Sequence, residues 1–141
     1  MLQPRRYCFK KNERLCLSND IKNVIANGKK IMSYPVLANY VIKDVEHSET
    51  VKIAISVAKR NFKKAVDRNL LKRRIREAYR HNKHNLISIV KQYNKVINVI
   101  IIYVSKEKLS YREIERGIAK LLDSLAKHIE KNSSSSSDIA N

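Results

Sequence analysis

Residues 56–80 read SVAKRNFKKAVDRNLLKRRIREAYR, and much of the charge of the chain is concentrated in this stretch. From Lys59 to Arg80 it carries ten basic residues against two acidic ones, a net charge of +8 in a 141-residue chain whose total is +17. It contains neither glycine nor proline, and from about Lys63 it consists mostly of residues that favour helices. The stretch therefore predicts a long, strongly basic helix.

The helical period sorts the charges of this stretch onto one side. With about 3.6 residues per turn, a basic stripe forms from Asn69, Lys72, Arg73, Arg76 and Arg80. The opposite side collects Leu70, Leu71, Ile75, Ala78 and Tyr79, while Lys64, Arg68 and Arg74 lie off the stripe. Like charges at helical spacing repel by a few tenths of a kcal/mol per pair, which favours a polyanionic partner such as nucleic acid. The alternative is a solvated charged face, but such faces usually mix both signs.

Length and composition indicate one domain with tails. We expect a basic N-terminal segment at 1–17, a single α+β domain at 18–130 and a disordered serine-rich tail at 131–141. The two cysteines, Cys8 and Cys16, are too few for a disulfide scaffold and indicate free thiols in a reducing cytoplasm. The first residues lack the apolar region of a signal peptide, and the longest apolar run is far too short to span a membrane.

The pattern around the basic stretch predicts the remaining elements. A short helix begins at Ser18 and is closed by Gly28, and strands at 35–43 and 51–58 are expected to pair as an antiparallel hairpin. Residues 86–93 favour a further helical turn or two, and 96–104 reads as a buried central strand. Ser110 and Glu113 have capping-box spacing at the start of a last helix with a long apolar stripe. The order α, β, β, α, β, α predicts an α+β sandwich.

No catalytic constellation is recognisable, and we expect no catalytic or metal-binding residue in this chain. His81 and His84 share one helix end, but no cysteine or carboxylate completes a metal site. Two glycines in the whole chain exclude a glycine-rich phosphate loop. The chemistry available is binding, in which Arg73 and Arg76 can each grip a phosphate bidentately and Asn69 can fix orientation.

Three blocks of the sequence resemble a known family. These blocks are ISVAKR at 55–60, KAVDRN at 64–69 and KRRIRE at 72–77. They are similar to the signature of the protein component of bacterial ribonuclease P, in which a basic helix follows a strand ending in Ser-Val, and the similarity extends over about residues 9–130. The resemblance implies an αβββαβα sandwich, a short first strand near 29–32 and a left-handed β-α-β crossover, as in the second domain of small-subunit ribosomal protein five.

The resemblance also implies a function. The chain would be the protein subunit of a ribonucleoprotein endoribonuclease that removes the 5′ leader of precursor tRNA, with catalysis and most of the Mg²⁺ belonging to the RNA subunit. Its partners would be ribonuclease P RNA and precursor tRNA, with one protein copy in the particle and no membrane. The RNA-binding residues would be Lys59, Arg60, Lys64, Arg68, Asn69, Lys72, Arg73 and Arg76, with Arg80 continuing the stripe. The leader-binding residues would be Ile21, Ile25, Asn39 and Tyr40.

Two departures from the family pattern stand out. Leu70 replaces the last arginine of the family's Arg-Asn-Arg triplet, and Ile21 and Ile25 occupy positions where the family can offer aromatic rings. An aliphatic side chain packs against a base but has no π face for stacking. The alternative function is a non-catalytic structural RNA-binding protein, such as a ribosomal or assembly factor, because the same basic stripe would serve it.

Overall fold

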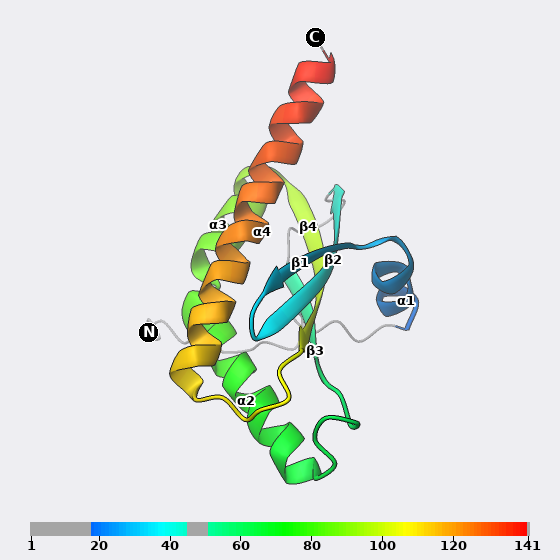
Figure 1. The fold of residues 1–141 in the computed structure, drawn as a ribbon. Helices are drawn as coiled ribbons and strands as arrows, with labels where there is room; N and C mark the ends of the chain where they lie inside the picture. Colours follow the sequence, from blue (N-terminus) through cyan, green and yellow to red (C-terminus); the bar gives the residue numbers. More distant parts are fainter. Residues whose placement is uncertain (1–17, 45–50, 141) are drawn as a thin grey trace, which may run out of the picture.

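The computed structural model describes residues 18–44 and 51–140, with side chains for 21–43 and 51–131. Its elements in chain order are α1 (Ser18–Asn27), β1 (Lys29–Ser33), β2 (Val36–Asp44), β3 (Val51–Val57), α2 (Ala65–Asn82), α3 (His84–Gln92), β4 (Lys95–Tyr103) and α4 (Tyr111–Ala140) (Figure 1). The short first strand and the extra turns after the basic helix, here β1 and α3, are both confirmed. The expected basic segment at 1–17 lies outside the described residues.

The four strands form one sheet in the order β1-β2-β4-β3. β1 pairs with β2 and β2 pairs with β4, both antiparallel, whereas β3 and β4 are parallel. The predicted antiparallel hairpin of the two strands at 35–43 and 51–58 is therefore wrong, because β4 lies between them. β4 is almost entirely β-branched and largely buried, and such a strand is most stable with a neighbour on both sides.

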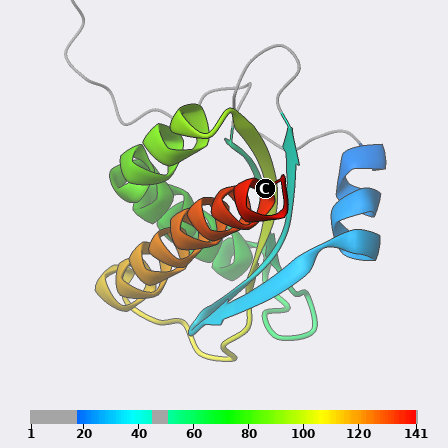
Figure 2. The same cartoon turned by 90° about the horizontal axis from the view of Figure 1, so that it is seen from above.

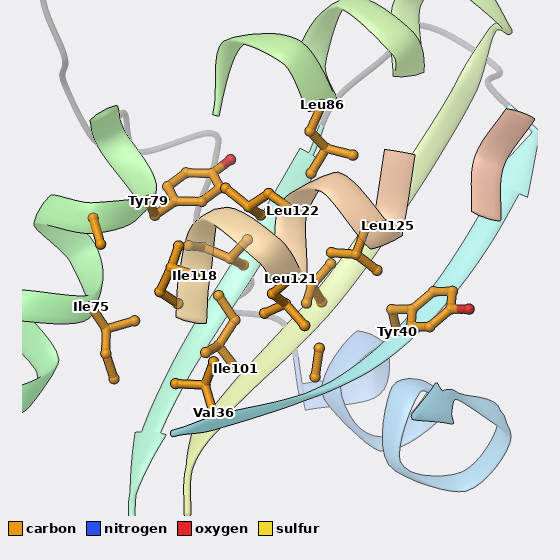
Figure 3. Close-up of a cluster of buried hydrophobic side chains, with 14 of the residues drawn as sticks. Val36, Tyr40, Ile75, Tyr79, Leu86, Ile101, Ile118, Leu121, Leu122 and Leu125 are labelled. Carbon is orange, nitrogen blue, oxygen red and sulfur yellow. The ribbon is translucent and has the colours of Figure 1, made fainter. Parts of the chain in front are cut away.

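Helices cover the two faces of the sheet unequally. Figure 2 shows α2, α3 and α4 on one face and, of the described helices, α1 on the other. The main core lies on the first face, where the predicted apolar stripe of α4 is buried along its whole length, from Ile114 to Ile129. Figure 3 shows Leu121 of this stripe beside Ile101 of β4. Burying one such side chain contributes about 1.5–3 kcal/mol, so this face dominates the stability of the domain.

The start of α4 follows the predicted capping box. The Glu113 amide donates to Ser110 Oγ at 3.3 Å, and the Ser110 amide donates to Glu113 Oε2 at 3.2 Å. α4 ends at Ala140 and so includes most of the serine-rich segment at 131–141, for which a disordered tail was predicted. Extending an existing helix fixes one residue at a time without a new nucleation step, and the serines lack the helix-breaking geometry of glycine or proline.

Gly28 joins α1 directly to β1. Its amide donates to the Val24 carbonyl at 2.8 Å, and a Cβ atom at this position would lie 2.2 Å from that same oxygen. Only glycine fits here without a backbone shift. α1 is thereby held over the second face of the sheet, where Val24 packs with Ile100 and the partly buried Ile102 in a small apolar cluster of its own.

Candidate nucleic-acid interface

α2 has one buried side and one charged side, as its sequence predicts. Leu71, Ile75, Ala78 and Tyr79 are buried, and Figure 3 shows Ile75 and Tyr79 directed toward α4. Asn69, Arg73 and Arg76 are exposed on the other side, while Lys72 and Arg80 are half-buried. Leu70, the departure from the family triplet, is also half-buried, at the margin between the two sides. The helix thus presents its basic stripe away from the core.

The two acids of α2 do not pair with the cations in the middle of the stripe. Asp67 accepts from Lys108 Nζ at 3.2 Å, and Glu77 contacts Arg80 at 2.9 Å and His81 at 3.0 Å. Within the described part of the chain, Lys72 and Arg73 form no ion pair, so the positive charge in the middle of the stripe is not offset locally. A solvated face of mixed sign would have paired these cations, and the arrangement instead favours an external anion.

Two arginines of α2 bind backbone atoms. Arg68 Nη1 donates to the carbonyls of Phe62 and Lys63 at 2.8 and 2.9 Å, which fixes the segment just before the helix. Arg74 Nη1 donates to the Leu109 carbonyl at 2.5 Å and connects α2 to the segment before α4. Arg68 was predicted to bind RNA, and in the structure its Nη1 also holds the backbone just before the helix. Arg74 lies off the stripe, as predicted.

Three predicted RNA-binding residues lie before the helix. Lys59, Arg60 and Lys64 are all exposed, and Arg60 lines a cavity of about 460 Å³ with Asn61 and Lys106. The cavity lies at the carboxyl ends of the parallel strands β3 and β4, and Ile102 on its wall also belongs to the cluster under α1. A concave, partly cationic surface therefore connects the start of α2 with the second face of the sheet.

The second face brings together three of the four predicted leader-binding residues. Ile21 is half-buried against the small apolar cluster, and Ile25 of α1 is 65% exposed. Asn39 is buried in β2, and its Oδ1 has no hydrogen-bond partner in the described part of the chain. Asn98 of β4 was missed by the sequence prediction. Its Oδ1 is also buried without a hydrogen-bond partner in the described part of the chain, and it lies diagonally from Asn39 on this face. An asparagine inside a β-branched strand was the available signal, since such a strand rarely buries a polar group without a partner.

Tyr40 does not join this group. Successive strand residues point to opposite faces, and Tyr40 is 2% exposed on the side of α4, where its hydroxyl lies 2.6 Å from His128 Nδ1. Burial raises the pKa of this phenol above its usual 10. The structure gives Tyr40 a role in the core beside α4 (Figure 3) and separates it from the face where a leader contact was predicted.

Two further tyrosines, Tyr103 and Tyr111, have phenol pKa values above the usual 10. Burial and the hydrogen bond to Glu115 raise the pKa of Tyr111 to about 12, and burial also raises the pKa of Tyr103. A phenol with a raised pKa stays protonated near neutrality and acts as a hydrogen-bond donor. Among the described residues, no three His, Cys, Asp or Glu side chains gather as a metal site, and none of the helices is long and apolar enough to cross a membrane.

Comparison with known proteins identifies the fold and the family. The structure is similar to that of the RNase P protein from Staphylococcus aureus, with a TM-score of 0.62 and 20% sequence identity over 79% of this chain and 93% of the other. The Thermotoga maritima RNase P protein gives a TM-score of 0.60 at 23% identity, covering 78% and 94% of the two chains. At this level of identity these two structures show a common fold.

Comparison of the sequence identifies the family as well as the fold. The ribonuclease P protein component of Porphyromonas gingivalis is 33% identical over 129 residues, which cover 92% of this chain and 94% of that protein. The family model for ribonuclease P matches residues 9–126, and this range includes all of the residues predicted to bind RNA or the leader. The chain therefore belongs to the ribonuclease P protein family.

Proposed function

We propose that this chain docks on ribonuclease P RNA through the exposed stripe of α2 and assists the removal of the 5′ leader from precursor tRNA. The observation that carries the proposal is the unpaired charge of Lys72 and Arg73 beside the exposed amide of Asn69. Arg73 can hold a phosphate with two parallel hydrogen bonds, and Asn69 adds a donor and an acceptor that fix the register of the RNA. Lys59, Arg60 and Lys64 extend the same surface toward the cavity at the strand ends.

We assign the leader to the second face of the sheet. Ile21 and Ile25 supply apolar contact area, and the carbonyl oxygens of Asn39 and Asn98 are acceptors that lack partners among the described residues. A single-stranded leader carries amino groups on its bases that can donate to such acceptors. The cavity beside Arg60 connects this face with α2, so one continuous surface is available to the catalytic RNA and to the substrate.

The chain contributes binding and orientation to the reaction. Its stripe neutralises RNA phosphates, and its second face holds the leader so that the scissile phosphodiester is positioned on the catalytic RNA. Mg²⁺ supplies Lewis-acid chemistry and an activated water for such a hydrolysis. We assign those ions mainly to the RNA subunit, since the described residues of this chain offer no cluster of metal ligands.

We further propose one protein copy in each particle and a cytoplasmic location. The location rests on the two cysteines, whose number indicates free thiols, and the stoichiometry rests on the family resemblance. Analytical ultracentrifugation of the reconstituted particle would measure the copy number directly, with one protein chain per RNA expected.

Reconstitution tests the main proposal. The purified chain is added to a bacterial ribonuclease P RNA at low Mg²⁺, and cleavage of a precursor tRNA is measured. We expect the protein to restore cleavage that the RNA alone performs only at higher Mg²⁺. A chain that binds this RNA without changing its Mg²⁺ requirement would instead be a structural RNA-binding protein.

Substitution of the stripe tests the docking surface itself. Arg73→Ala together with Arg76→Ala should weaken binding to ribonuclease P RNA by about 1–3 kcal/mol per residue, since charge-assisted hydrogen bonds are lost. The melting temperature should barely change, because both side chains are exposed. Lys91→Ala with Lys127→Ala removes two exposed charges elsewhere and is the matched control. Equal losses in both double variants would mean that only net charge matters and would contradict a specific docking face.

A further inference from the structure

A second surface, separate from both α2 and the face under α1, has the composition of a single-nucleotide site. It is a cavity of about 230 Å³ between the β1–β2 turn and the first half of α4, lined by Tyr34, Pro35, Leu109, Glu113, Arg116, Gly117 and Lys120. Figures 1 and 2 both place this turn beside the start of α4. Its volume is below the roughly 300–1,000 Å³ of pockets for drug-sized ligands, so it suits one flat ring rather than a large cofactor.

The cavity has a rigid base. Ser33 Oγ donates to the Gly117 carbonyl at 2.7 Å and links the turn to α4. A Cβ atom at Gly117 would lie 2.7 Å from both Pro35 Cδ and the Tyr34 carbonyl oxygen, so the helix approaches this turn as closely as it does only because residue 117 is glycine. Close backbone packing at this point preforms the cavity.

The wall of the cavity carries an exposed aromatic ring. Tyr34 is 64% exposed, yet its hydroxyl donates to Ser105 Oγ at 3.1 Å, and Ser105 is buried. A large exposed aromatic side chain that is tethered at its tip offers a ring of fixed orientation at little further entropic cost. Aromatic rings held in this way are the stacking platforms on which proteins bind single-stranded bases.

The rim of the cavity is cationic. Arg116 and Lys120 are one helical turn apart on α4, both are exposed, and within the described residues neither forms an ion pair or a hydrogen bond. The one carboxylate at the rim, Glu113, is engaged at the start of α4 by the Ser110 amide. Two cations beside an exposed ring match a phosphate beside a base, and this charge complementarity identifies the occupant as nucleic acid.

We infer that this cavity binds one unpaired nucleotide of single-stranded RNA, with the base stacked on Tyr34 and the adjacent phosphate held by Arg116 and Lys120. A paired base is stacked inside its helix and cannot present its face to the ring, so duplex RNA is excluded. The inference adds a second RNA contact to the proposed function but does not depend on docking through α2.

Crosslinking of the full chain tests the site. The probe is an eight-nucleotide oligouridylate that carries 4-thiouridine, compared with a duplex RNA of equal charge, and the crosslinked peptide is identified by mass spectrometry. We expect a crosslink to the Tyr34 peptide with the single strand and none with the duplex. Crosslinks confined to α2, or equal labelling of Tyr34 by both probes, would overturn the inference.

A second experiment measures the affinity of the chain for the oligouridylate. All variants also carry Arg73→Ala and Arg76→Ala, which weaken RNA binding by the α2 stripe. Tyr34→Ala should weaken oligouridylate binding about tenfold, within the range for loss of one base–aromatic stack. Tyr34→Phe keeps the ring but loses the hydrogen bond to Ser105 Oγ, so its affinity should fall by less than that of Tyr34→Ala. Arg116→Gln with Lys120→Gln should lower the slope of log affinity against log salt by about 0.7, for one phosphate contact to a single strand.

Arg112→Gln with Lys127→Gln removes the same charge from other parts of α4 and serves as the control for that slope. An equal decrease in this control, or no decrease in affinity in Tyr34→Ala, would overturn the assignment of the cavity. Cleavage of precursor tRNA by the reconstituted particle tests docking through α2 independently of this cavity. A chain that restores cleavage but shows no Tyr34 crosslink would leave the proposed function intact and refute only this site.

Discussion

The two faces of the sheet are built from neighbouring residues of the same strands but have opposite character. The face toward α2, α3 and α4 is covered by a continuous apolar core with Ile101 at its centre. The face toward α1 has only a small apolar cluster and buries the carbonyl oxygens of Asn39 and Asn98 without partners in the described part of the chain. An unpaired buried carbonyl costs stability. The difference indicates that the first face holds the domain together, whereas the second leaves buried acceptors without partners among the described residues.

The sharpest test of this difference uses two adjacent residues of β4. Ile101 is fully buried in the main core, and Ile102 is partly buried on the face of α1. Ile101→Ala should lower the free energy of unfolding by about 2–5 kcal/mol. Ile102→Ala should lower it by only about 1 kcal/mol, since less apolar area is lost. Urea denaturation measures both, and equal losses would show that the two faces contribute alike.

A gain of function tests the face under α1. Ile25 is 65% exposed on α1, so Ile25→Phe adds a π face without disturbing the core. Stacking on one leader base should strengthen the binding of precursor tRNA to the holoenzyme by about 1–3 kcal/mol and leave the binding of mature tRNA unchanged. Ile25→Leu, which keeps an aliphatic side chain, is the matched control. An identical gain for mature tRNA would place the contact outside the leader.

The smallest expected effect concerns the unpaired amides. Asn39→Val removes a carbonyl that has no partner within the described residues, so the free energy of unfolding should stay the same or rise by up to about 1 kcal/mol. Affinity for a precursor with a long leader should fall by a similar amount, about 1 kcal/mol, if the amide binds the leader. A precursor with a one-nucleotide leader is the internal control. Marked destabilisation by Asn39→Val would mean that this amide is structural.

Local features of the fold could be predicted from the sequence, but strand pairing could not. The capping box of Ser110 and Glu113 depends on residues three positions apart, and the closure of α1 at Gly28 depends on one turn of helix. The position of β4 between β2 and β3 depends on residues far apart in the chain. Strand propensity does not say which strands pair, so pairing of the two strands that are closer in sequence was predicted incorrectly.

In the candidate site, too, only features that follow from a local sequence pattern could be predicted. The basic stripe of α2 follows from helical period alone, and the structure exposes Asn69, Arg73 and Arg76 of it while Lys72 and Arg80 are half-buried. The alternation of side chains along a strand already implied that Asn39 and Tyr40 point in opposite directions, so only one of them could line a given face. The bonds of Arg68 to two backbone carbonyls and the exposure of Tyr34 depend on loop conformation, for which no periodic pattern exists.

The position of β4 has a consequence for how the molecule is made. The ribosome synthesises α2 before β4, yet β4 is the strand that joins β2 to β3 and completes the sheet on which α2 packs. Pairing between such distant segments is slow relative to local helix formation. A nascent chain that ends before Lys95 therefore carries the basic residues of α2 without the scaffold that orders them. The packing of α2 on a complete sheet therefore depends on a strand that is synthesised after it.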